Sequence, residues 1–139
     1  MINRKAIFSR ANITAVATFI LVALVLGLSS CNWFRDFDFE RGARLTGGDP
    51  QVGRRQLAMH SCSSCHVIPG VAKADGRRGP SLAHWYGRRT FLDTVPNTPE
   101  NMEKWLEKPS HRKPGTTMPD LSVSSQESRD MTAYLFSIN

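Results

Sequence analysis

The sequence predicts a small all-α domain of about three main helices with long loops, preceded by an N-terminal extension. Two observations carry this prediction. Segments with apolar residues at helical spacing begin at residues that cap helices well. No segment alternates apolar and polar residues as a half-buried strand does, and the connecting segments are rich in glycine, proline and basic residues.

The first two helices are predicted from their start signals. Residues 50–61 follow Asp49, a good cap, and begin with a proline, which suits the first turn of a helix. Residues 99–108 follow Thr98 and stop before Pro109. The side chains that we expect these helices to bury are Val52, Leu57, Met59, Met102, Trp105 and Leu106.

The third helix has the strongest signal. Residues 124–127 read S-S-Q-E, a capping box in which Ser124 caps the helix and Glu127 binds back to the cap. The apolar residues that follow recur at intervals of three and four. This spacing predicts an amphipathic helix with one core-facing side, formed by Met131, Tyr134, Leu135 and Ile138.

The first 30 residues have the pattern of a secretion signal. Residues 1–10 hold three basic side chains and no acidic one, and residues 13–28 are almost wholly apolar but short for a membrane span. Residues 28–31 read L-S-S-C, which resembles the lipobox of bacterial lipoproteins and implies acylation of Cys31.

These features divide the chain into three parts. We expect a signal peptide at residues 1–30, a lipid-anchor cysteine and tether at residues 31–49, and a folded domain at residues 50–139. An uncleaved signal anchor and an ordinary cleaved signal are the alternatives. All three readings place the domain on the far side of a bacterial membrane.

A short cysteine motif carries the chemistry. Residues 62–66 read C-S-S-C-H, the pattern of a c-type haem attachment site. In such a site two thiols form thioethers to the haem vinyl groups, and the adjacent imidazole becomes an iron ligand. A thioredoxin-like motif would need a βαβ context, and a zinc site would need a second ligand pair. The sequence therefore predicts one covalent haem c, with its iron, held by Cys62, Cys65 and His66.

Met118 is the expected second iron ligand. It lies in a loop at residues 114–121 that is rich in proline and glycine, not on a helix face. A thioether pairs well with haem iron and raises its reduction potential. The alternatives are a core methionine and ligation by His111. With His66 and Met118 both on the iron, no position is free for a substrate or a gas.

The motifs resemble those of the class I, single-haem cytochromes c, over about residues 50–139. The shared features are a glycine in the first helix, at Gly53, a Gly-Pro-x-Leu run at residues 79–82 and an aromatic-Leu-x-x-Pro run at residues 105–109. The resemblance implies a small helical fold whose loops wrap around the haem. It also implies that the last helix crosses the first one at Gly53.

The resemblance also assigns roles to further residues. It implies that the Pro80 carbonyl accepts a hydrogen bond from the ring of His66, which orients this ligand. It places Arg88 near a haem propionate, with Arg89 as the alternative, and Trp105 near the methionine side of the haem.

The expected function is one-electron transfer, not enzymatic catalysis. We expect a carrier tethered to the periplasmic side of a bacterial membrane, with a donor dehydrogenase or a terminal oxidase as redox partner. A haem enzyme, a gas-binding sensor with an open sixth position, and a haem subunit of a larger oxidoreductase complex are the alternatives.

The charge balance is compatible with this function. Residues 31–139 contain 15 basic and 12 acidic side chains, and this small positive excess suits docking onto an acidic protein surface. No basic helix or binding motif accompanies this charge, so nucleic acid is not expected as a partner. A small-molecule substrate is not expected either, because His66 and Met118 would leave no position open on the iron. Five basic side chains either surround the haem edge or form an ordinary solvated surface: Lys73, Arg77, Arg78, Arg88 and Arg89.

Overall fold

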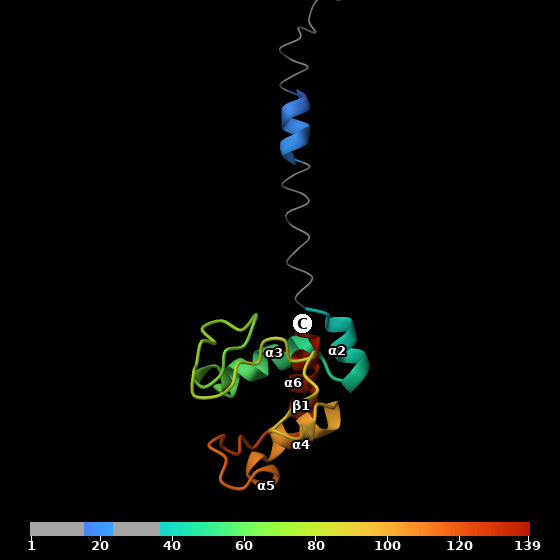
Figure 1. The fold of residues 1–139 in the computed structure, drawn as a ribbon. Coiled ribbons are helices and arrows are strands. Elements are labelled where there is room, and N and C mark those ends of the chain that lie inside the picture. The colour runs from blue at the N-terminus through green and yellow to red at the C-terminus, as the bar shows by residue number, and fades with distance from the viewer. Residues whose placement is uncertain (1–15, 24–36) are drawn as a thin grey trace, which may run out of the picture. The chain divides into compact units, whose positions relative to one another are not determined.

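The computed structural model describes residues 16–23 and 37–139 (Figure 1). The chain divides into two units near residue 36, and the second unit holds the folded domain. Residues 16–23 are helical. Within the described residues, no helix combines the length and the hydropathy that a membrane crossing requires. Cys31 and the expected cleavage site lie outside the described residues.

The folded unit begins earlier than residue 50. Residues 37–49, expected to be a tether, include helix α2 (Phe39–Thr46), which packs against the last helix, α6 (Ser125–Ser137). The carboxylate of Asp38 caps α2 by accepting the N–H of Arg41 at 2.9 Å, and Gly47 ends it in the left-handed conformation. The two helices approach closely at Gly42, where an added Cβ would lie 2.2 Å from the Ala133 carbonyl oxygen.

The three predicted helices are present, with ends one or two residues earlier than expected. They are α3 (Pro50–Met59), α4 (Pro99–Glu107) and α6. Each predicted cap makes its hydrogen bonds: Asp49 accepts two backbone N–H groups, Thr98 accepts one, and the capping box of α6 is complete. A short helix that was not predicted, α5 (Pro109–Arg112), follows α4.

Helix α6 lies at the centre of the domain, with α2, α3 and α4 packed against it (Figure 1). Its predicted core face is confirmed, because Met131, Tyr134, Leu135 and Ile138 are each at most 1% exposed. The burial extends further than the predicted single face, and covers every residue from 130 to 137. Three helices surround α6, so its polar residues are enclosed as well.

The prediction that Met59 is a core residue is wrong, since its side chain is 78% exposed. Met59 lies two residues after the buried Leu57, and two residues correspond to about 200° around a helix. Met102, by contrast, is 1% exposed and belongs to the core as expected.

A small hairpin was also not predicted. β1 (Thr90–Phe91) pairs with β2 (Val95–Pro96) in antiparallel register. Strands of two residues are too short to produce an alternating pattern in the sequence. The hairpin directs Phe91 into the core. The centre of its ring lies 5.8 Å from the ring centre of Trp85 and 6.4 Å from that of Trp105.

Candidate haem site

The C-x-x-C-H motif begins just beyond the end of α3. Ser61 takes a left-handed conformation, with φ at 58°, and turns the chain into the 3₁₀ helix η2 (Cys62–Ser64). The carbonyl oxygen of Cys62 then accepts backbone N–H groups from Cys65 at 3.2 Å and His66 at 2.9 Å. The motif is therefore one tight turn, with partly buried, free thiols at Cys62 and Cys65.

The ring of His66 is oriented by the Gly-Pro-x-Leu run. Its Nδ1 lies 2.7 Å from the carbonyl oxygen of Pro80, the contact that the resemblance implied. A carbonyl can only accept a hydrogen bond, so Nδ1 carries the proton and the lone pair of Nε2 is free to bind a metal. Such a contact fixes the ring of a metal-ligating histidine and increases its donor strength.

Backbone contacts hold this run beside the motif. The N–H of Gly79 donates to the Cys65 carbonyl at 2.8 Å, and the N–H of Leu82 donates to the Val67 carbonyl at 2.8 Å. An added Cβ at Gly79 would lie 2.3 Å from Cε1 of His66. Glycine is therefore needed here so that the backbone can approach the imidazole.

The thiol of Cys62 does not have the properties of a redox-active cysteine. Its pKa is raised to about 11, chiefly by burial and to a smaller extent by the neighbouring Cys65, while a backbone hydrogen bond lowers it in part. Thiol–disulfide oxidoreductases rely on a lowered cysteine pKa, because the thiolate is the attacking species. The environment of Cys62 therefore argues against a thioredoxin-like role.

Tyr134 is a site residue whose contact the sequence did not reveal. Its hydroxyl donates a 2.5 Å hydrogen bond to the carbonyl of Pro69, three residues after His66. Burial raises the pKa of Tyr134 to about 12, so the group remains a donor. This bond joins the centre of α6 to the loop that follows the C-x-x-C-H motif.

Met118 lies in the loop between α5 and α6. It is partly buried and packs against the hydrophobic core, as do Cys62 and the buried Trp105. Its N–H donates to the hydroxyl of Thr116 at 3.2 Å, which shapes the loop locally. The competing candidate, His111, is exposed on α5.

The side chain of Arg88 also contacts the Gly-Pro-x-Leu run, which orients His66. Its guanidinium donates to the carbonyls of Ser81 and Ala83, the latter at 2.9 Å, and lies 4.7 Å from the centre of the Trp85 ring. Partial burial lowers the pKa of Arg88, although arginine stays charged. Its neighbour Arg89 is exposed.

Trp85 is a second residue that sequence reasoning missed. It is 4% exposed, and its indole N–H is buried without an acceptor among the residues that the structure describes. A buried donor is normally paired, because leaving it unpaired costs free energy. Its only sequence signal is an aromatic residue between the Gly-Pro-x-Leu run and Arg88.

Across residues 16–23 and 37–139, no three side chains of His, Cys, Asp or Glu come together in a way that could hold a metal ion.

Residues 52–139 match the sequence profile of the family described as Cytochrome c, which is more than half of the chain. The chain belongs to the cytochrome c family. Its small, mainly helical fold agrees with this assignment. A cytochrome c domain implies an electron-transfer protein, and its cofactor is covalent haem c with iron. Cytochrome c domains are extracytoplasmic.

A relative with a known role is cytochrome c oxidase subunit 2 of Bacillus sp. (strain PS3), which is 30% identical over 82 residues. The match covers 56% of this cytochrome and 23% of that subunit, so this chain spans less than a quarter of its relative.

The residues of this cytochrome fit haem c. The donor set contains two thiols on one turn, an imidazole with a free Nε2 and a thioether at the edge of the core. The indole N–H of Trp85 has no acceptor among the described residues, and the guanidinium of Arg88 lies 4.7 Å from the centre of the same ring. Both groups are hydrogen-bond donors, which suit a carboxylate group like a haem propionate.

Proposed function

We propose that this cytochrome is a class I, membrane-tethered electron carrier of a bacterial respiratory chain. In this proposal Cys62 and Cys65 bind the haem covalently, and His66 and Met118 ligate its iron. The bound haem supplies a one-electron Fe(III)/Fe(II) couple. The observation that carries the assignment is the contact of 2.7 Å between His66 Nδ1 and the Pro80 carbonyl, which leaves Nε2 as the iron-binding atom.

The surroundings of Met118 favour this residue over His111 as the second ligand. Met118 packs against the same core as Cys62, whereas the side chain of His111 is exposed. A thioether ligand raises the reduction potential, which suits a carrier that accepts electrons from a dehydrogenase and passes them to an oxidase. With His66 and Met118 both as iron ligands, the chain's residues would need only to hold these two ligands in place and to exclude water.

The proposed redox partner is a terminal oxidase, or a dehydrogenase as donor. The likeness to an oxidase subunit 2 supports the first, and it also keeps open the role of a haem subunit in a larger complex. Exposed basic residues follow the haem-binding motif in the sequence and suit an acidic docking surface: Lys73, Arg77, Arg78 and Arg89.

Replacing the proposed axial thioether tests the function. We expect Met118→Ala to keep covalent haem but to lose the weak far-red band that a ferric thioether complex shows. The reduced variant should then bind carbon monoxide rapidly, and its reduction potential should fall. The measurements are absorption spectra and a redox titration of the purified protein. A variant with the wild-type spectrum and potential would rule out Met118 as ligand. A wild-type protein that itself binds carbon monoxide rapidly would favour the sensor or enzyme alternative.

The membrane tether has a separate test. If Cys31 carries a lipid, Cys31→Ser should release the cytochrome from the membrane fraction of the cells that produce it. Persistent attachment of this variant would indicate an uncleaved signal anchor instead.

A further inference from the structure

The loop that carries Met118 is closed by a side chain. The carboxylate of Asp120 uses both oxygens to bind Ser110, ten positions earlier in the sequence. Oδ1 accepts the backbone N–H of Ser110 at 3.0 Å, and Oδ2 accepts its hydroxyl at 2.7 Å. Met118 lies inside the loop that this pair of bonds closes.

The segment from Pro109 to Val123, which includes this loop, is anchored in the core at its two ends but is mostly exposed between them. At one end Pro109 is fully buried, and at the other Leu121 packs against the core and Val123 is 8% exposed. Between them, every residue except Thr116 and Met118 is exposed. The loop is therefore free to swing outward except where its own contacts hold it.

The other side-chain contacts of the loop differ from the Asp120 pair. The guanidinium of Arg112 donates one exposed hydrogen bond, of 3.0 Å, to the side-chain oxygen of Asn101 on α4. The hydroxyl of Thr116 binds the N–H of Met118, a contact between near neighbours that moves with the loop. The ammonium of Lys113 lies 3.5 Å from the carboxylate of Asp93, and both side chains are more than half exposed. A single exposed ion pair between two flexible side chains contributes little, because water competes for both charges. Asp120 and Ser110 are exposed too, but their contact consists of two hydrogen bonds, one of which holds the backbone N–H of Ser110.

We propose that the bonds between Asp120 and Ser110 form a latch that keeps Met118 on the haem iron, with Asp120 as a positioning residue. This inference rests on the proposed ligation by Met118. For the thioether to leave the iron, the loop must swing outward, and this motion separates Asp120 from Ser110. Two hydrogen bonds to one carboxylate are charge-assisted and hold a defined geometry. The latch therefore controls how often Met118 dissociates, and not whether it binds.

The rate of imidazole binding to the ferric cytochrome tests the latch. Imidazole can bind the iron only after Met118 has left, so at saturating imidazole the rate reports dissociation of the thioether. We expect Asp120→Asn and Ser110→Ala each to raise this rate about fivefold, since each removes part of the latch. Both should keep the thioether band at rest. The double variant should be only slightly faster than either single one, because the two residues act as one unit.

Asp93→Asn is the matched control. It removes the same charge and breaks a contact of the same loop at Lys113, so we expect the wild-type rate. Wild-type rates in Asp120→Asn and Ser110→Ala, with the thioether band intact, would overturn the latch alone. Equal acceleration by Asp93→Asn would also overturn it, because the effect would then be one of charge. A wild-type protein without the band would overturn the proposed ligation and the latch with it.

Discussion

The imidazole of His66 is held by two neighbours that act in different ways. The Pro80 carbonyl fixes the tautomer and direction of the ring through its hydrogen bond of 2.7 Å. Gly79 acts by what it lacks, since any β-carbon there would collide with the ring. The sequence predicted the Pro80 contact only through the resemblance. His66 and Pro80 are fourteen positions apart, and such a spacing does not by itself predict a contact.

Gly79→Ala should therefore disturb the iron ligand directly. The new methyl group would lie 2.3 Å from His66 Cε1, so the ring or the backbone must shift. We expect the free energy of unfolding to fall by about 2 kcal/mol and the haem spectrum to change. Denaturant unfolding and absorption spectroscopy measure both effects. Gly87→Ala is the control, since its nearest atom would be 3.8 Å away. Equal stability and equal spectra in the two variants would contradict this reading.

At the scale of an element, α6 starts with contacts that reach beyond its own first turn. The carboxylate of Glu127 accepts the N–H and the hydroxyl of Ser124 at 2.8 and 2.9 Å. It also lies 3.3 Å from the ring of His60, the residue that caps the C-terminal end of α3. The capping box was evident in the sequence, whereas the link to His60 exists only because α3 and α6 pack together.

These contacts predict a pH dependence of stability. The bonds from Ser124, followed by the bond from His60, lower the pKa of Glu127 below its ordinary value of 4.5. A carboxylate with a lowered pKa in the folded state contributes stability above its unfolded-state pKa, and this is lost as the pH falls through the folded-state value. Glu127→Gln should therefore melt below the wild type at about pH 7, and the difference should vanish towards about pH 3.

Thermal unfolding between these pH values measures the effect. In a Ser124→Ala background, which removes the hydroxyl partner of Glu127, the same substitution should have a smaller effect at every pH. A difference between wild type and Glu127→Gln that stays constant down to the lowest pH would refute the prediction.

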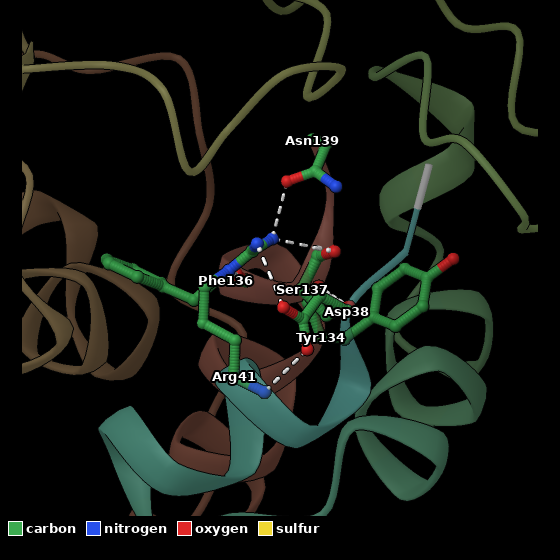
Figure 2. A network of polar contacts seen from close by, with 6 residues as sticks. All are labelled: Asp38, Arg41, Tyr134, Phe136, Ser137 and Asn139. Atoms are coloured by element: carbon green, nitrogen blue, oxygen red, sulfur yellow. Dashed lines mark hydrogen bonds and ion pairs between the residues drawn. The ribbon is translucent and has the colours of Figure 1, made fainter. Parts of the chain in front are cut away.

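At the scale of the whole molecule, segments from both sides of the domain meet at the end of α6. Arg41 of α2 donates to the carbonyls of Phe136 and Ser137 at 3.0 and 3.2 Å (Figure 2). It also donates to the side chain of Asn139 at 2.8 Å and lies 4.0 Å from the centre of the Tyr86 ring. Tyr86 in turn precedes Arg88 in the chain, so α2 is joined to the loop that leads back to the haem site.

Arg41→Ala should therefore destabilise the whole domain. The side chain is 12% exposed. Its loss would leave the Phe136 carbonyl without this donor and would remove one of two donors from the Ser137 carbonyl, which also accepts the N–H of Asp38. We expect the free energy of unfolding to fall by about 2 kcal/mol, measured by denaturant unfolding of the haem-containing protein. Arg41→Lys keeps the charge but not the forked geometry, so it should recover only part of the loss. Wild-type stability of Arg41→Ala would show that the hydrogen bonds of this side chain do not stabilise the domain.

Features set by neighbouring residues were determined by the sequence alone. The C-x-x-C-H motif and the caps at Asp49, Thr98 and Ser124 each depend on groups within a few positions of one another. The haem-binding motif and the helix caps can therefore be predicted without knowledge of the tertiary structure.

What only the tertiary structure decided depends on contacts between distant segments. The sequence around α2, rich in aromatic and charged residues, was interpreted as a tether. Its helix is part of the folded domain only because it packs against α6, which lies far away in the sequence. Three further features depend on residues that only the folded chain brings together. The ring of Trp85 is buried with Arg88 over it, the hydroxyl of Tyr134 binds the Pro69 carbonyl, and Asp120 binds Ser110. A spacing in the sequence cannot reveal such a partner, because the free energy that joins the two residues comes from burial across the whole domain.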